Sequence, residues 1–281
     1  MNKLIMSGKD VGQRLDQWLL KRTKLPWDFI NKILRKKELR ISGLHVTKNY
    51  RLKNQDLLEY PKYLSLETPI LEPSGMIDTF KKWIIYEDDN ILVINKPAGI
   101  ASQGGVGIKI SIDVLAAEHS ESKINHRLDK NVSGLLVLGK TSEGCVVDIK
   151  DKIYYAIATG QVPESGVVSV KIGKVGIREG VCENGKLATT YYECIEKLIK
   201  EKEYSLVKLK LETGRKHQIR VHLGECLKAP VLGDYKYGGE DMSRIYLHAY
   251  SVLVGGKTFT APLPNEFQSK IVELGFKTVI K

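Results

Sequence analysis

The sequence has no run of 18 apolar residues, so it offers no segment long enough to cross a membrane as an apolar helix. Residues 1–10 lack the apolar core of a secretory signal peptide, and they also lack the arginine- and serine-rich character of a transit peptide. We therefore expect no membrane partner. The expected location is cytoplasmic, most simply in a bacterium, with an organelle matrix as the alternative.

Cysteine is scarce, and none of the four cysteines forms a C-x-x-C pair or lies near a histidine at zinc-ligand spacing. Reduced structural thiols in a reducing compartment are expected for Cys145, Cys182, Cys194 and Cys226. The glycine-rich stretch 104–107 matches neither G-x-G-x-x-G nor a P-loop, and it is expected to be a flexible loop near a site. The residues therefore predict neither a bound metal nor a cofactor.

Acidic residues are too few to balance the lysines and arginines, and the net charge is +11. Residues 1–60 hold 14 Lys and Arg against 6 Asp and Glu, whereas residues 61–281 hold 30 against 27. A compact basic region is the electrostatic feature expected of a protein that binds a nucleic-acid backbone. Charge alone leaves open a second interpretation, a solvated surface that only aids solubility.

The basic first segment has the pattern of two helices followed by short strands. One helix is predicted around Leu15–Leu20, and a second at 27–37, entered from Pro26. The second helix places apolar residues on one face and cations on the other. The apolar set is Ile30, Ile33 and Leu34, and the cationic set is Lys32, Arg35 and Lys36. Strands are predicted at 39–41, 45–46 and 56–60.

A proline-rich composition at 61–80 predicts a boundary, and strand patterns dominate beyond it. Segments 83–86 and 91–94 flank a turn and predict a hairpin. Further strands are predicted at 134–138, 154–158 and 204–212, and helices at about 111–119, 217–226 and 265–274. The predicted fold is α+β, a small αα-β domain followed by a domain on a mostly antiparallel mixed sheet. The predicted divisions are 10–62, a linker at 63–80, and 81–281.

Two polar segments are candidates for chemistry. In His126–Lys130 a carboxylate lies between two cations just before a buried strand, so Asp129 is expected to be ionised at neutral pH. In Thr213–His222 a glycine turn leads into a helix on which His217 and Arg220 are expected to share a face. Such clusters bind phosphate or pair a buried carboxylate. Either segment alone could also be a solvated ion-pair cluster, and His126 with Asp129 lacks an obvious third metal ligand.

Together the two segments resemble the RluA family of pseudouridine synthases. The resemblance rests on His126-Arg127-Leu128-Asp129 with the strand at 133–137, and on Thr213-Gly214-Arg215 with the residues that follow to His222. It spans about 83–265. Supporting matches lie in the same order at 91–99, 152–154, 233–238, 247–249 and 261–264. Residues 10–60 resemble the S4 RNA-binding module.

The resemblance implies an isomerase that converts uridine in RNA to pseudouridine and needs no cofactor or metal. It implies Asp129 as the catalytic carboxylate, acting either as nucleophile or as base at the ribose. Arg220 is implied as the cation that holds Asp129 ionised. Tyr154 is implied as the aromatic residue stacked on the target base, and its hydroxyl could assist proton removal from C5. The target must flip out of its stack, with Arg127 filling the space.

The predicted RNA-binding residues share a positive or polar side chain and lie in both predicted domains. They are Arg127, His126, Lys32, Arg35, Lys36, Arg40, Arg215 and His217. Large-subunit ribosomal RNA is the expected substrate, with tRNA as the alternative, and a monomer is assumed.

Two departures from the family pattern keep a second hypothesis open. The family usually has threonine at the position of Val132, and only ten residues separate Thr141 from Lys152, where the family usually carries a longer helical insert. The second hypothesis is a non-catalytic RNA-binding or ribosome-assembly factor, for which Asp129 would be dispensable.

Overall fold

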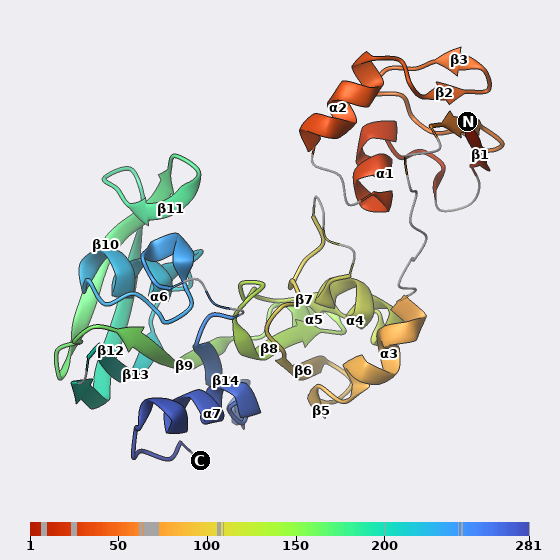
Figure 1. Cartoon of the computed structure of the whole chain (residues 1–281). Helices are drawn as coiled ribbons and strands as arrows, with labels where there is room; N and C mark the ends of the chain where they lie inside the picture. The colour runs from red at the N-terminus through yellow and green to blue at the C-terminus, as the bar shows by residue number, and fades with distance from the viewer. Residues whose placement is uncertain are drawn as a thin grey trace. The chain divides into compact units, whose positions relative to one another are not determined.

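The computed structural model describes residues 1–6, 10–23, 27–61, 64, 73–105, 108, 110–199, 201–240, 242 and 244–280. The chain forms two compact units, drawn in Figure 1. The N-terminal unit is Met1–Gly75 with Gly104–Ile110, and the larger unit is Met76–Gln103 with Ser111–Lys281. Some positions used in the predictions lie outside the described residues: Pro26, residues 62–63 and 65–72, and 106–107 of the glycine-rich stretch.

The N-terminal unit combines two helices with a four-stranded antiparallel sheet of order β1-β4-β2-β3. The elements are β1 Asn2–Ile5, α1 Leu15–Arg22, α2 Trp27–Arg35, β2 Arg40–Ile41, β3 Leu44–His45 and β4 Leu57–Tyr60. Both predicted helices and all three predicted strand segments are present. Helix α2 ends two residues early because Lys37 adopts a positive φ of 55°, which no helix can continue through. Strand β1, four residues long, was not predicted.

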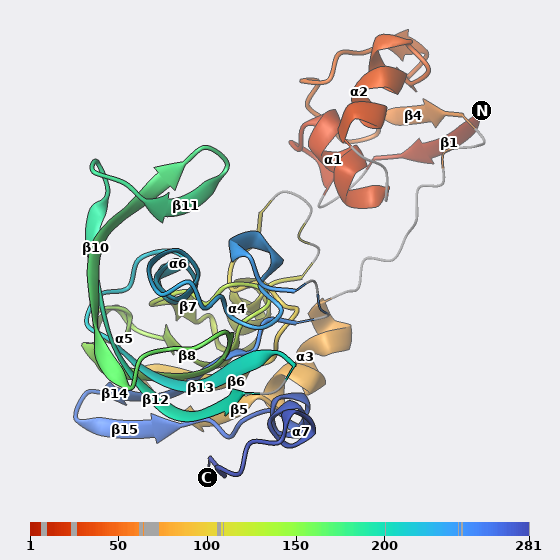
Figure 2. The same ribbon diagram turned by 60° about the vertical axis from the view of Figure 1, so that its left-hand side comes forward.

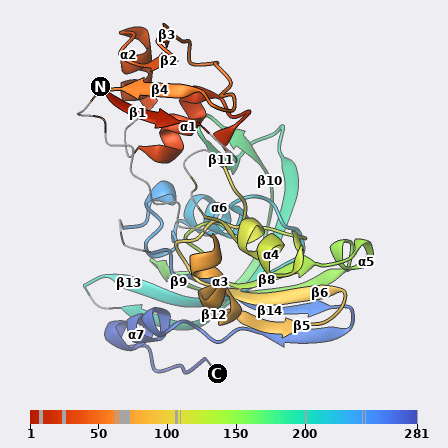
Figure 3. The same ribbon diagram turned by 90° about the vertical axis from the view of Figure 1, so that its right-hand side faces the viewer.

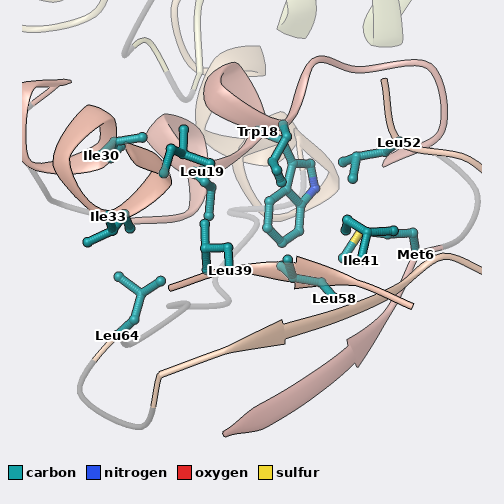
Figure 4. Close-up of a cluster of buried hydrophobic side chains, with 12 residues drawn as sticks. Met6, Trp18, Leu19, Ile30, Ile33, Leu39, Ile41, Leu52, Leu58 and Leu64 are labelled. Atoms are coloured by element: carbon teal, nitrogen blue, oxygen red, sulfur yellow. The ribbon is translucent and has the colours of Figure 1, made fainter. Parts of the chain in front are cut away.

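The core of the N-terminal unit is formed by the apolar faces of α1 and α2 and by the sheet beneath them (Figure 4). Trp18 lies at its centre above Leu58, and its indole nitrogen donates to Asp10 Oδ1 at 2.8 Å. Each large apolar side chain that is fully buried contributes about 1.5–3 kcal/mol, so this cluster holds the unit together. As the helical periodicity predicts, Lys32, Arg35 and Lys36 are exposed; Arg40 of β2 is exposed as well.

The larger unit is built on an eleven-stranded sheet in which nine strands follow the order β11-β10-β12-β13-β9-β14-β8-β6-β5, with β15 added to β14 and β7 to β8. All neighbours are antiparallel except β14 and β8. The predicted α+β fold on a mostly antiparallel mixed sheet is confirmed. The strands are β5 Ile84–Glu87, β6 Ile91–Lys96, β7 Lys123–Ile124, β8 Ser133–Gly139, β9 Ile149–Thr159, β10 Ser165–Val175, β11 Arg178–Val181, β12 Lys186–Ile199, β13 Glu203–Leu211, β14 Leu247–Val254 and β15 Lys257–Thr260.

Helices cover both faces of this sheet, as Figure 3 shows: α4 and α6 lie on one face and α7 on the other. Helix α7 packs through Phe267 and Ile271 against Ile157 of β9 and Leu206 of β13. The helical segments are α3 Pro73–Lys81, α4 Ile112–Ser120, α5 Ser142–Cys145, α6 Gln218–Val221, the π-helix η2 His222–Cys226, the 3₁₀ helix η3 Tyr235–Tyr237 and α7 Asn265–Leu274.

Three features of the larger unit differ from the sequence-based expectations. Residues 73–80 of the predicted linker 63–80 belong to helix α3, Pro73–Lys81, whose Phe80 is buried in edge-on contact with the Trp83 ring. The predicted helix 217–226 divides into a short α-helix and a π-helix. Strands β10 to β12 were not predicted, although Val168, Val170 and Ile172 alternate with polar residues and carry the period-2 signal of a strand.

A close approach between β8 and β14 requires the glycine that follows the polar segment 126–130. Gly134 has a φ of +116°, and a Cβ added there would lie 2.2 Å from the carbonyl oxygen of Ala249. Only glycine fits both the backbone angle and the space. Strand β8, which begins four residues after Asp129, is thereby locked against its parallel neighbour in the middle of the sheet.

Candidate active site

One cleft in the larger unit gathers residues that lie far apart in the sequence. It is lined by Asp129 from the loop before β8, Tyr154 from β9 and Arg220 from α6. Arg127, Arg215 and His217 line the same cleft. Of the seven predicted site residues in this unit, only His126 is not part of the lining.

Asp129 and Arg220 form the charged centre of the cleft. Arg220 Nη1 donates to Asp129 Oδ2 at 2.7 Å. The rest of the guanidinium is held by a second carboxylate, because Nε and Nη2 donate to the two oxygens of Asp234 at 2.6 and 2.8 Å. The side chains of Arg220 and Asp234 are 8% and 1% exposed, whereas Asp129 is 25% exposed. Asp234 thus anchors the arginine, and Asp129 is the carboxylate that the cleft presents.

The charge of Arg220 is strongly favoured. Burial alone would lower its pKa, but hydrogen bonds to Asp234 and the charge of Asp129 outweigh burial and raise the pKa of Arg220 above its usual value. The guanidinium also lies 5.0 Å from the ring centre of Tyr237. Asp129 therefore faces a guanidinium that stays charged.

Gln218 fixes the turn that leads to Arg220. Its Oε1 accepts from the Thr213 hydroxyl at 2.8 Å and from the Arg215 N–H at 2.9 Å. Its Nε2 donates to Thr189 O and Thr190 Oγ1 on β12, at 3.0 and 2.9 Å. Because Gln218 is buried and its amide is fully bonded, the start of α6 cannot shift without breaking four hydrogen bonds.

Ser102 and His126 hold the loop that carries Asp129. The Ser102 hydroxyl donates to Leu128 O at 2.7 Å and accepts from Leu128 N at 3.0 Å. His126 Nε2 accepts from the Val137 N–H of β8 at 3.1 Å. Burial lowers the pKa of His126 to about 3, so the ring is neutral. This geometry gives His126 a structural task, which differs from the RNA contact predicted from the sequence.

Lys96 at the end of β6 supports the next residue of the loop. It is fully buried, and its Nζ donates to the carbonyl oxygens of Pro97, Ile100 and Lys130 at 2.9, 2.9 and 3.3 Å. Three acceptors match the three hydrogens of an ammonium group. Burial lowers the pKa of Lys96 to about 7, and the nearby charge of Asp129 acts in the opposite direction. The carbonyl of Lys130, the residue after Asp129, is thus held by an amine that is itself out of contact with solvent.

His217 is the second side chain at the Asp129 carboxylate, with Nε2 3.6 Å from Oδ1. The Tyr237 hydroxyl donates to Glu179 O at 3.0 Å, since a carbonyl can only accept. The hydrogen in the 2.7 Å contact between Tyr237 and His217 Nδ1 therefore comes from Nδ1. In the neutral ring, Nε2 then carries the lone pair and faces Asp129. Burial lowers the pKa of His217 despite the nearby carboxylate.

His217 and Arg220 do not share a helix face as predicted. His217 has a positive φ of 57° and stands before α6, whereas Arg220 lies within it. Both side chains still meet at Asp129, because the left-handed turn points the histidine back into the cleft.

Tyr154 is held in the middle of the sheet, where it pairs with Leu209 of β13 and Ala249 of β14. Burial, together with the charge of Asp129, raises the pKa of its hydroxyl far above the usual value, so the phenol is protonated at neutral pH. The short segment between Thr141 and Lys152 contains only the four-residue helix α5 before β9 begins. The position of Tyr154 depends on sheet pairing rather than on that segment.

Val132, the departure closest to Asp129, is buried and lines the cleft. Its backbone N–H donates to Asp129 O at 3.1 Å, a bond that any residue type except proline can make. The turn at Asp129 therefore does not require the usual threonine hydroxyl.

A buried polar chain supports the start of β8. His248 Nε2 donates to Ala261 O at 3.1 Å, so Nδ1 accepts from the Ser133 hydroxyl at 2.9 Å. The same hydroxyl accepts from Arg244 Nη2 at 2.8 Å. Burial lowers the pKa of His248 to about 4, in keeping with a neutral ring. Each donor in this row of hydrogen bonds has one defined acceptor, so the row specifies one arrangement of the residues behind the Asp129 loop.

Several supporting residues were not predicted from the sequence. Asp234 and Tyr237 lie in the segment 233–238, which entered the prediction only as a family signature. The available signal was chemical: a buried arginine needs more than one acceptor. Within the described ranges, no group of three or more His, Cys, Asp or Glu side chains could hold a metal ion. None of the described helices is long and apolar enough to cross a membrane.

Comparison with known proteins gives consistent matches. The profile of the RNA pseudouridylate synthase family matches residues 90–225. The ribosomal large subunit pseudouridine synthase C of Rickettsia felis is 33% identical over 94% of this chain and 97% of its own length. The protein of the same name from Haemophilus influenzae is 32% identical over 89% of this chain and 85% of its own length.

The fold also has a counterpart among solved structures. Human RNA pseudouridylate synthase domain containing 4 superposes with a TM-score of 0.60, covering 73% of this chain and 98% of that protein at 23% identity. The alignment with the Rickettsia felis protein is 301 positions long and so exceeds the 281 residues of this chain. That relative therefore contains segments with no counterpart here.

Proposed function

Because the chain belongs to the RNA pseudouridylate synthase family, whose members isomerise uridine to pseudouridine in RNA, we propose that Asp129 carries this reaction and that large-subunit ribosomal RNA is the substrate. The observation that carries the proposal is the pairing of Asp129 with the buried Arg220 in a cleft shared with Tyr154. A carboxylate that is paired with a cation, fixed and still accessible is the group that the reaction needs.

The reaction breaks the bond between C1′ and N1, turns the detached uracil and joins C1′ to C5. One proton leaves C5 and one is returned to N1, so the composition of the RNA is unchanged. Asp129 acts at the ribose, as nucleophile or as base. Its Oδ2 accepts from Arg220, so Oδ1 is the oxygen that remains for the substrate.

Tyr154 stacks on the target base through its ring. Aromatic stacking on a base is worth about 1–3 kcal/mol, and every base offers a face for it. The protonated phenol is poorly suited to take a proton in the ground state, so the ring is the larger part of its contribution. Arg127 is exposed and lines the cleft, a position that suits it to fill the stack left by the flipped uridine.

The N-terminal unit acts as an S4-like RNA-binding module. Its exposed cations supply phosphate contacts that orient the RNA without reading its sequence; they are Lys32, Arg35, Lys36 and Arg40. In the larger unit, Arg215 and His217 contribute contacts at the cleft itself.

Large-subunit ribosomal RNA is proposed because relatives that match over most of their length carry that substrate in their names. Such a substrate places the protein where ribosomes are made, in the bacterial cytoplasm or in an organelle matrix. Asp129, Tyr154 and Arg220 come from one chain, so a monomer suffices for the chemistry.

The test is to express the protein in cells that lack their own large-subunit pseudouridine synthases and to map pseudouridine in ribosomal and transfer RNA. We expect new pseudouridines in large-subunit ribosomal RNA. New sites in tRNA alone would contradict the substrate. No new site in any RNA would contradict the activity and favour a non-catalytic factor.

A further inference from the structure

A second cavity of about 310 Å³ lies beside the active-site cleft, within the range of small-ligand sites. The hairpin β10–β11, which arches over α6 in Figure 2, forms one side of it through Ile172, Gly173 and Glu179. The first residue of β12 contributes Lys186, and the loop before α6 contributes Arg215 and Lys216.

The cavity has an excess of positive charge. Its lining contains the three cations Lys186, Arg215 and Lys216 against the single carboxylate of Glu179. Lys216 Nζ lies 3.0 Å from Glu179 Oε1, so that pair neutralises itself. No carboxylate in the described part of the chain pairs with Lys186 or Arg215. Two uncompensated cations in one cavity favour an anion as ligand.

Arg215 is held in a way that leaves its outer nitrogens for a ligand. Its Nε donates to Leu187 O at 3.1 Å, which fixes the guanidinium against β12. A guanidinium binds phosphate through two nitrogens, and a lysine beside it adds a point charge. The arrangement of Arg215 and Lys186 suits a phosphodiester.

The wall of the cavity is backbone rather than side chain where β10 meets the turn before β12. A Cβ added to Gly185 would lie 2.5 Å from the backbone of Ile172, and one added to Gly173 would lie 2.9 Å from Cys182 Sγ. The two glycines allow the turn to lie directly against the hairpin, which places Lys186 at the cavity rather than away from it.

Arg215 lines both the cavity and the active-site cleft. The left-handed turn at His217 lies between the cleft and the cavity. His217 faces Asp129 in the cleft, whereas Arg215 and Lys216 reach the cavity beside the hairpin. A uridine in the cleft stays joined to its neighbours by two phosphodiesters. We propose that this cavity binds the phosphodiester of a nucleotide that adjoins the target uridine in RNA, with Lys186 and Arg215 as its ligands. The inference rests on the proposed function.

The experiment pairs a protein variant with a modified RNA. The RNA is a short ribosomal fragment that the wild-type enzyme modifies, prepared with one uncharged methylphosphonate at each linkage near the target in turn. The variant is Lys186→Ala. The control is Lys174→Ala, an exposed lysine of the same hairpin that does not line the cavity. For each pairing, kcat, KM and the dissociation constant are measured, the last as a function of salt.

We expect Lys186→Ala to raise KM about fivefold with kcat unchanged and to reduce the salt slope by about one unit, as the loss of one phosphate contact does. One uncharged linkage should weaken binding by the wild type and have no further effect on Lys186→Ala. Lys186→Glu should bind more weakly still, whereas Lys174→Ala should match the wild type.

Two results would overturn the subsite. One is a Lys186→Ala enzyme that behaves like Lys174→Ala. The other is a linkage penalty of equal size in the wild type and in Lys186→Ala at every position. Failure of the proposed function looks different, because the wild type would then form no pseudouridine in any RNA, and the subsite would fall with it.

Discussion

Replacing Asp234 by asparagine tests whether this buried carboxylate fixes the position of Arg220 and, through it, of Asp129. Asp234 accepts two hydrogen bonds from Arg220 at 2.6 and 2.8 Å, and neither side chain is more than 8% exposed. Removing one partner of a buried ion pair costs about 3–5 kcal/mol. Asp129 still compensates part of the arginine charge, and the asparagine oxygen keeps one hydrogen bond. We therefore expect Asp234→Asn to lower the free energy of unfolding by about 2–3 kcal/mol.

The assay is urea unfolding, with Glu240→Gln as the matched control. Glu240 pairs with Lys202 at 2.7 Å, a distance like those between Arg220 and Asp234, but the side chains of Glu240 and Lys202 are 42% and 60% exposed. A pair of that kind contributes about 0–1 kcal/mol. We also expect kcat to fall at least about tenfold in Asp234→Asn with little change in KM, since Arg220 loses the anchor that aims it at Asp129. Equal unfolding free energies for Asp234→Asn and Glu240→Gln would refute the reasoning.

Two further predictions concern base stacking and pH. Tyr154→Phe should keep RNA affinity within about threefold, whereas Tyr154→Ala should lose about 5- to 150-fold, as the removal of one base stack does; similar affinities in filter binding would exclude stacking. Burial lowers the pKa of His126 to about 3 and the pKa values of His222 and His248 to about 4, below the usual 6.5, so the unfolded state binds more protons between pH 4 and 6.5. The stabilisation from these three neutral histidines should therefore be fully present above about pH 6.5, and the free energy of unfolding should fall by up to about 4 kcal/mol per unit as pH drops through that window. Urea unfolding at pH 7, 6 and 5 checks this, and a pH-independent free energy would contradict it.

The elements that could be predicted from the sequence are those whose side-chain periodicity is local. The amphipathic helix α2, the hairpin β5–β6 and the buried strand β8 each show their pattern within a few residues. The β10–β11 hairpin carried the same kind of signal and was overlooked. The mixed order of the sheet could not be predicted, because pairs such as β8 with β14 join segments more than 100 residues apart.

The candidate site also contains residues that the sequence identifies and residues that it does not. Asp129, Tyr154 and Arg220 were identified by family motifs, and the structure brings them to one cleft. The groups that hold them could not be found by pattern. The roles of Lys96, Asp234 and Gln218 depend on which carbonyls and hydroxyls surround them after folding, and those partners come from distant strands and loops.

The most direct test of the account is pseudouridine formation by Asp129→Asn. The control is Asp151→Asn, since Asp151 is 52% exposed and pairs with Lys210 outside the cleft. With a ribosomal RNA fragment that the wild type modifies, we expect Asp129→Asn to lose at least about 10³-fold in rate, the scale seen when a catalytic group is removed. RNA affinity and the unfolding midpoint should stay close to those of the control. An Asp129→Asn enzyme that forms pseudouridine within tenfold of the wild-type rate would contradict the central claim.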